Sequence, residues 1–318
     1  MSAPRTQAPT LVVLAGGLAK RYGGLKPLAP AGLHGEAVID LTVSDALSAG
    51  FGDVVMVLGP QTASAIEYHV QRCWPSWVDV DFTVQPVPLG TAHAVLCARP
   101  LVDDGPFAVV NSDDVYGAPA LERLARQLQD SASVSGEQAL VAFALKDTIV
   151  SDKPVTRGTC VVNADGTLSA IVERRKVSMG EDGRVRCDDG LEPAELDPEV
   201  PVSVNLWGFT DSIWAVLEEA VLSVHPGIGP DGSVRDRHQV KGDVEVLLPE
   251  VVGEVLSRPD RTSVATVRVL KSPGRCLGFT HAEDLPIVSS EIASMIGQGE
   301  RPEALWSTSG GGRAAAGA

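Results

Sequence analysis

The stretch that decides the fold is LVVLAGGLAKRYGGLKPL, residues 11–28. Its first four residues are apolar and predict a short buried strand, which breaks directly into a glycine turn at residues 15–17. Glycine lets backbone N–H groups approach a ligand closely, and clustered cations suit a polyphosphate better than a neutral molecule. The loop after the turn contains three such cations, Lys20, Arg21 and Lys26. We therefore expect a nucleotide-triphosphate loop; the alternative is an ordinary glycine turn whose cations are solvated.

Two better-known glycine motifs are absent from this loop. The dinucleotide fingerprint G-x-G-x-x-G does not occur, and the G-x-x-x-x-G-K-[ST] phosphate loop fails because Lys26 is followed by Pro27. A proline disfavours helix at the residue before it, so Lys26 is expected on extended backbone.

The pattern continues as alternating helices and strands. Helical spacing over residues 37–49 leads to an apolar strand at residues 54–58, and a helix near residues 62–73 leads to a strand at residues 80–84. Strand, helix and strand at this spacing predict right-handed parallel units. The fold class is therefore α/β, a doubly wound and mostly parallel sheet with its ligand outside the carboxyl ends of the strands.

Polar residues follow the predicted strand at residues 107–110, at the edge where a ligand is expected. Asp113 and Asp114 are adjacent carboxylates, which need a cation or hydrogen bonds nearby. Mg²⁺ is held by one or two carboxylates plus substrate phosphates, so we expect a Mg²⁺ site. The alternative is an Asx turn that caps the next helix. His93 lies one turn into a predicted helix, where we expect a structural role.

Composition excludes several classes of protein. The 318 residues carry a net charge of −15, which argues against a general nucleic-acid binder. The five cysteines contain no C-x-x-C pair, so neither a disulfide framework nor a zinc site is expected. No apolar run is long enough for a membrane span or a signal core. We expect a soluble, cytoplasmic domain at residues 10–306, between a flexible tail at 1–9 and a disordered one at 307–318.

The second half predicts a β-rich region. A hairpin with a tight Asp-Gly turn is expected over residues 156–168, and the acidic, glycine-rich residues 177–200 suggest a mobile loop or insertion. We expect residues 225–242 to order only with substrate. A helix over residues 243–255 and a strand over residues 263–270 complete the pattern.

The opening AGGLAKRYGGLKPL, with GEAVIDLTVSDALSAGF after it, resembles the sugar-1-phosphate nucleotidyltransferases, or NDP-sugar pyrophosphorylases. The resemblance continues through PLGTAHAV, NSDDVYG, VSVNLWGF and LGFTHAED, and covers residues 10–306. It implies a Rossmann-like domain with a nucleotide-binding half, residues 10–150. Residues 151–306 would then be the sugar-phosphate-binding half, with an inserted β-rich subdomain.

The resemblance also implies the site residues. Arg21 would stabilise charge on the departing pyrophosphate, Lys26 would bridge the two reacting phosphates, and Asp113 would hold Mg²⁺. The nucleotide would contact Leu14, Ala15, Gly16, Gly17, Lys20, Gln85, Gly90 and Thr91. The acceptor would contact Asp114, Gly158, Glu173, Arg174 and Asn205, with Arg174 replacing the lysine of the family's E-K-P segment. The family's second metal aspartate is missing from its usual motif, so either Asp284 substitutes for it or the second metal contact is absent.

The implied reaction is Mg²⁺-dependent transfer of a nucleotide from a nucleoside triphosphate to a sugar-1-phosphate, with release of pyrophosphate. Gln85 and Gly90 match a Q-x-x-P-x-G stretch that reads uracil or thymine, which favours UTP or dTTP. One alternative is a cytidylyl- or guanylyltransferase acting on a cyclitol, alditol or phosphonate. Another is a non-catalytic, nucleotide-sensing homologue. Neither a nucleic acid nor a membrane is an expected partner, and a homo-oligomer is possible.

Overall fold

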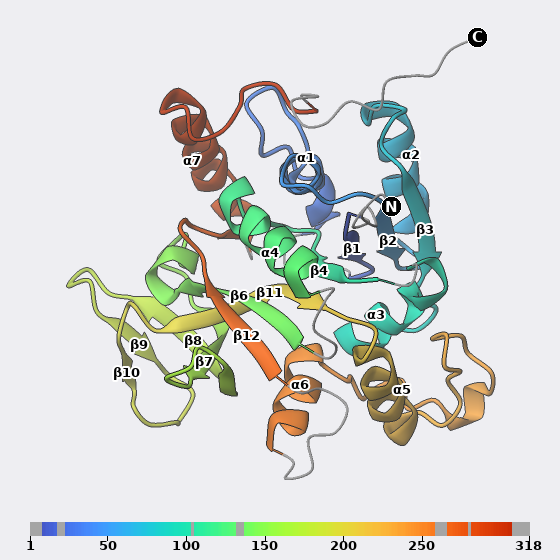
Figure 1. Cartoon of the computed structure of the whole chain (residues 1–318). Coiled ribbons are helices and arrows are strands. Elements are labelled where there is room, and N and C mark those ends of the chain that lie inside the picture. Colours follow the sequence, from blue (N-terminus) through green and yellow to red (C-terminus); the bar gives the residue numbers. More distant parts are fainter. Residues whose placement is uncertain are drawn as a thin grey trace, which may run out of the picture.

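Four parallel strands form one end of the sheet in the computed structural model (Figure 1). The structure describes residues 8–17, 23–102, 105–131, 137–257, 266–278 and 281–306. The strands lie in the order β3-β2-β1-β4, and their bounds are β1 Thr10–Ala15, β2 Val54–Leu58, β3 Val80–Val84 and β4 Phe107–Asn111. All three neighbouring pairs are parallel, so the α/β fold class and these strands are confirmed.

Helices cover both faces of these strands because successive side chains point to opposite faces. Val12, Val55 and Val109 pack toward one group of helices, and Val13 and Met56 pack toward the other. The first group contains α3 Thr91–Ala98, α5 Ile213–Val224 and α6 Leu248–Ser257. The second contains α1 Val38–Ser48, α2 Ala63–Cys73 and α4 Ala118–Ser131. Figure 1 shows α4 and α3 on opposite faces of the sheet.

Strand β11, Pro201–Phe209, divides the sheet. One edge pairs with β6 Glu137–Ala144, which in turn pairs with β12 Thr266–Lys271. The other edge has two partners, because Ser203 pairs with β7 Val155–Val162 whereas Trp207 pairs with β4. Between these positions the register shifts, and Asn205 has a positive φ of 61°. The two partners therefore diverge at Asn205; we call this place the fork.

Antiparallel strands extend the sheet beyond the fork. The hairpin of β7 and β8, Leu168–Met179, is confirmed, and Gly166 in its Asp-Gly turn has a φ of 82° that suits glycine. Two further strands follow, β9 Val185–Cys187 and β10 Glu195–Leu196. Of the two expectations for residues 177–200, a mobile loop or an insertion, the loop is wrong, because β8, β9 and β10 pair there in register.

Other local expectations are also corrected. Helix α6 begins at Leu248, because the residues before it run alongside residues 89–92 and Val246 bonds to Leu89 and Ala92. Residues 225–242 pack on α3 through Gly232 and the ring of His93, and the expectation that they order only with substrate stays a prediction. Lys26 starts a single 3₁₀ turn instead of lying on extended backbone. Helix α7, Leu285–Gly297, was not expected.

The remaining elements are short. Strands β5 Asp114–Val115 and β13 Leu277–Gly278 form a separate pair. The 3₁₀ turns are η1 Lys26–Leu28, η2 Arg99–Leu101, η3 Leu145–Thr148, η4 Arg237–Gln239 and η5 Ala282–Asp284. None of the helices that the structure describes is long and apolar enough to cross a bilayer.

Candidate functional site

A cleft of about 600 Å³ opens at the fork. Its walls come from the carboxyl end of β4, the facing residues of β7 and β8, the bend of β11 and one side of α6. Because β4 and β7 share one edge of β11 and then diverge, side chains from both halves of the chain meet around the same space.

Four residues expected to bind the acceptor line this cleft: Asp114, Gly158, Glu173 and Asn205. Gly158 and Glu173 are directly paired across β7 and β8, so they share a face of the sheet. The Asn205 amide nitrogen lies 3.5 Å from Asn111 Oδ1, and Trp207 Nε1 donates to Asn205 Oδ1 at 3.2 Å. The structure thus brings these residues together, and their contacts with a substrate stay predictions.

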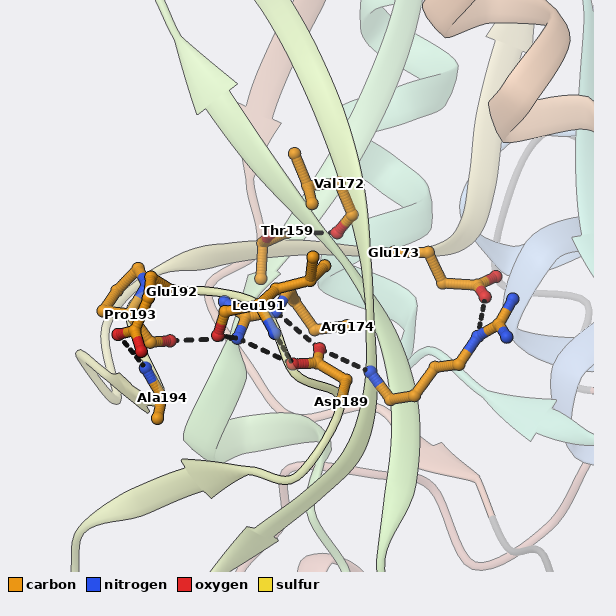
Figure 2. A network of polar contacts seen from close by, with 10 residues as sticks. Thr159, Val172, Glu173, Arg174, Asp189, Leu191, Glu192, Pro193 and Ala194 are labelled. Carbon is orange, nitrogen blue, oxygen red and sulfur yellow. Dashed lines mark hydrogen bonds and ion pairs between the residues drawn. The ribbon is translucent and has the colours of Figure 1, made fainter.

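Arg174 is not among the residues that line the cleft, and Figure 2 shows its side chain beside Asp189, away from the side chain of Glu173. Its guanidinium donates to Asp189, with Nε 2.7 Å from Oδ2 and Nη2 3.1 Å from Oδ1, and also to the carbonyl oxygens of Leu191 and Pro193. Glu173, the preceding residue, lines the cleft instead. The expectation that Arg174 contacts the sugar phosphate is therefore corrected.

The far wall of the cleft is acidic. Glu173 accepts a hydrogen bond from Arg175 Nε at 2.7 Å, and α6 contributes Glu250 and Glu254. Burial, followed by the charges of Glu173 and Glu254, raises the pKa of Glu250 above its ordinary value. Three carboxyl groups therefore lie on the side that would receive the part of an acceptor farthest from the fork.

Lys26 and the two aspartates lie together at one end of the cleft, which we call the near end. Lys26 Nζ lies 3.3 Å from Asp113 Oδ2, and the lysine side chain is only 12% exposed. Asp114 accepts from the amide of Asn111 at 2.9 Å, and Gly278 opposite leaves no room for a side chain against its carboxyl group. Burial and then the charge of Asp113 raise the pKa of Asp114 to about 6. The chain thus holds two carboxyl groups together beside one ammonium group.

This donor set fits Mg²⁺. The available atoms are hard carboxylate oxygens, and Mg²⁺ is typically bound by one or two of these plus substrate phosphates. Among the described residues, no three His, Cys, Asp or Glu side chains gather closely enough to hold a metal ion by themselves. Asp284 is buried, does not line the cleft, and accepts from the backbone N–H of His281 at the start of η5. Its role as a second metal ligand stays a prediction.

The expected nucleotide loop begins where β1 ends. Leu14 pairs with Asn111, and a Cβ placed on Gly16 would lie 3.2 Å from Gln85 Oε1. Gln85 Nε2 donates to the Gly90 carbonyl at 3.0 Å and lies 3.2 Å from His93 Nδ1. The glycine turn of residues 15–17 and the expected base-reading amide are therefore adjacent. Lys20 and Arg21 lie outside the described residues.

His93 has the structural place expected of it. The ring is fully buried, and its Nε2 lies 2.9 Å from the Gly232 carbonyl oxygen. Burial lowers the pKa of His93, so the neutral form that these contacts suit is favoured.

Gly90 and Thr91 connect the nucleotide side to α6. Gly90 has a φ of 93° and lies so close to Val246 that a Cβ would not fit. The Thr91 hydroxyl accepts a hydrogen bond from the backbone N–H of Leu248 at 2.8 Å. The base-side loop thus supports the helix that forms one wall of the cleft, a link that residue spacing does not reveal.

Sequence reasoning also missed Arg157, which lines the cleft next to Gly158. Its position before an expected substrate-binding glycine was the available signal. The pattern around Glu173 drew attention to Arg174 instead.

Comparisons with known proteins show what the chain resembles. A family model described as nucleotidyl transferase matches residues 10–156. The bifunctional protein GlmU of Anaeromyxobacter dehalogenans is 32% identical over 181 residues, covering 56% of this chain and 35% of that protein. The likeness in sequence to the nucleotidyl transferases therefore lies in the first half of the chain. The chain spans about a third of the length of the curated relatives it matches.

Among solved structures, a likeness in fold covers most of the chain. UTP-bound UGPase from Acinetobacter baumannii has a TM-score of 0.57 at 16% identity, covering 90% of this chain and 93% of that one. The inositol-1-phosphate CTP transferase from T. maritima also has a TM-score of 0.57, at 14% identity, covering 89% of this chain and 95% of that one. At these identities the likeness concerns the fold alone.

Proposed function

We propose that this chain transfers a nucleotide from a nucleoside triphosphate to a sugar-1-phosphate and releases pyrophosphate, in a reaction that depends on Mg²⁺. The observation that carries the proposal is the pair of Lys26 and Asp113 at the carboxyl ends of the strands, beside a cleft lined by Asp114 and Asn205. Cation and carboxylates at one end suit phosphates and a metal, and amide and carboxyl groups around the remainder suit hydroxyl groups.

The chemistry needs little from the protein beyond position and charge. The second pKa of a phosphate monoester is about 6, so most of the acceptor is already a dianionic nucleophile at pH 7 and no protein base is required. Lys26 would draw the two reacting phosphates together, and Asp113 would hold the metal. Mg²⁺, when bound, would neutralise phosphate charge. Catalysis would then rest on alignment of the groups and stabilisation of the charge that develops as pyrophosphate leaves.

The base preference rests on one amide. Gln85 favours UTP or dTTP, but its Nε2 is already bonded to Gly90 and His93. The acceptor atom Oε1 then remains for the base, and it suits the N3–H of uracil or thymine. It also suits the exocyclic amino group of cytosine, so cytidylyl transfer to a non-hexose phosphate is the second candidate.

A pyrophosphate-release assay tests the proposal. Each of ATP, CTP, GTP, UTP and dTTP is combined with a panel of sugar-1-phosphates and of cyclitol, alditol and phosphonate acceptors, with and without Mg²⁺. We expect release that requires both Mg²⁺ and an acceptor, with UTP or dTTP preferred and a sugar-1-phosphate used. Turnover with CTP and a non-hexose phosphate alone would favour the second candidate. Nucleotide binding without turnover on any acceptor would contradict both.

A further inference from the structure

The charges that line the cleft are unbalanced. Four side chains carry carboxyl groups: Asp114, Glu173, Glu250 and Glu254. Among the described residues, the single lysine or arginine that lines the same space is Arg157. A phosphate dianion entering this cleft needs cationic partners, because unscreened carboxylates would repel it.

Arg157 is fixed by neutral groups only. Its Nε donates to Thr148 Oγ1 at 2.9 Å, its Nη2 to the Thr148 carbonyl at 2.6 Å, and its Nη1 to the Thr156 carbonyl at 2.8 Å. None of these acceptors is charged, and the three bonds leave guanidinium N–H groups to spare. Within the described ranges no carboxylate lies within ion-pairing distance of Arg157.

The neighbouring arginines behave differently. Arg174, Arg175 and Arg186 on β8 and β9 each pair with an aspartate or glutamate. Arg157 is half-buried on β7 and is held in one orientation. A guanidinium that is oriented in advance loses less freedom when it binds, and its planar fork matches two oxygens of a phosphate.

The position of Arg157 is close to the expected reaction centre. Arg157 and Asp114 both line the cleft, and Asp114 is the neighbour of Asp113 in the sequence. Lys26 contacts Asp113 directly. Arg157 therefore lies where a phosphate that meets Lys26 could also meet a second cation, while the remainder of the acceptor extends into the cleft.

We propose that Arg157 binds the phosphate group of the acceptor, in the role that the sequence pattern assigned to Arg174. This inference rests on the proposed function, since it names the residue that anchors the acceptor in that reaction. Arg157 would set the acceptor's position and affinity, and the nucleoside triphosphate would bind without it.

The test compares Arg157→Gln and Arg157→Lys with wild type in the pyrophosphate-release assay. Arg186→Gln is the matched control, because Arg186 is an exposed arginine of the same sheet. We expect Arg157→Gln to raise the acceptor KM by about 10- to 100-fold, with the KM for the nucleoside triphosphate within about twofold of wild type. Arg157→Lys should be intermediate, because it keeps the charge but loses the fork. Arg186→Gln should match wild type.

A second measurement does not depend on turnover. Inorganic phosphate is titrated calorimetrically into wild type and into each variant that retains the wild-type melting temperature. Weaker phosphate binding in Arg157→Gln, with normal binding in Arg186→Gln, would support the assignment. Equal phosphate affinity and an unchanged acceptor KM would overturn it. If wild type releases no pyrophosphate with any acceptor, the proposed function fails, and the phosphate titration still decides whether Arg157 is an anion site.

Discussion

Lys26 combines low exposure with a direct contact to a carboxylate. Its side chain is 12% exposed and its ammonium group lies 3.3 Å from Asp113. A lysine in this position is oriented before any substrate arrives, and its charge compensates part of the repulsion between Asp113 and Asp114. It is therefore the described residue whose loss should affect the chemistry most directly.

We expect Lys26→Met to reduce turnover by at least about 10²-fold, because removal of one charged group that stabilises a transferring phosphate has effects of this size or larger. Pyrophosphate release at saturating substrates measures the loss, and the melting temperature reports folding. Lys271→Met is the matched control, since Lys271 is an exposed lysine at the end of β12. Near-normal turnover of Lys26→Met would contradict the role assigned to Lys26.

Arg174 and Asp189 form a buried ion pair, with side chains 3% and 4% exposed. Asp189 also accepts the backbone N–H groups of Arg175 and Leu191, so a single carboxylate joins β8 to the loop after β9. Hydrogen bonding to the Arg174 guanidinium holds the pKa of Asp189 well below its ordinary value. The pair therefore fixes the strand that directs Glu173 toward the cleft.

Asp189→Asn should lower the melting temperature by several degrees, because it leaves the Arg174 guanidinium enclosed without its counter-charge. Asp188→Asn is the control, since the adjacent Asp188 side chain is 88% exposed. The folded pKa of Asp189 is depressed, so its stabilisation is present above about pH 4 and declines as pH falls through the folded value. Denaturation at pH 7 and pH 3 should show the difference from wild type shrinking in acid. A constant difference would contradict this account.

At the scale of elements, α6 begins without a cap of its own. Leu247 precedes the helix and has no side-chain acceptor, so the N–H of Leu248 is bonded by the Thr91 hydroxyl at the start of α3. Backbone bonds between Val246 and residues 89–92 strengthen the same junction. The helix that carries Glu250 and Glu254 is thus positioned by the loop expected to read the base.

We expect Thr91→Val to raise the acceptor KM several-fold and to destabilise the protein by about 1 kcal/mol, the usual effect of losing a helix cap. Thr91→Ser keeps the hydroxyl and should remain close to wild type in both respects. Urea denaturation and the two KM values provide the measurements. A rise confined to the KM of the nucleoside triphosphate would instead indicate that Thr91 contacts the nucleotide.

The elements that the sequence predicted are those fixed by local pattern. Residues 54–58 and 80–84 are continuous or alternating strand sequences, and their bounds agree with β2 and β3. The start of α6 was not predictable, because it depends on Thr91, far away in the sequence. The face on which Arg174 lies depends on pairing of β7 with β8, including a register shift. The types of side chain at the site could therefore be predicted from the sequence, but the directions in which those side chains point could not.

At the scale of the whole molecule, one sheet includes strands from both halves of the chain, residues 10–150 and 151–306. Residues 225–246, from the second half, pack against α3 and the residues just before it. His225 lies in this segment, fully buried, with Nδ1 accepting from the backbone N–H of Lys241 at 3.2 Å. Its Nε2 has no hydrogen-bond partner in the part of the chain that the structure describes. Burial lowers the pKa of His225, so the folded protein favours the neutral ring.

This histidine should make stability depend on pH. Below about pH 6.5 the unfolded chain takes up a proton on His225 that the folded chain does not, so the free energy of unfolding falls until pH reaches the lower folded pKa. Urea denaturation between pH 8 and pH 5.5 should therefore show wild type losing stability relative to His225→Phe. His238→Phe, at an exposed histidine of the same segment, should show no such trend. Protonation of Asp114 changes the free energy of unfolding in the opposite direction. Because Asp114 is present in all three proteins, its effect cancels when their stabilities are compared. Parallel curves would contradict the prediction.

The fork gives the two sides of the cleft unequal freedom to adapt. On one side, β4 and β7 are paired with β11 by backbone hydrogen bonds, so the cleft could widen there only if these bonds broke. On the other, α6 is held by its buried apolar face, by a threonine hydroxyl and by a short run of backbone bonds, with no strand pairing. A library aimed at bulkier acceptors should thus vary the exposed α6 positions and leave the strand side alone, because only the helix can tilt outward while the catalytic end keeps its alignment.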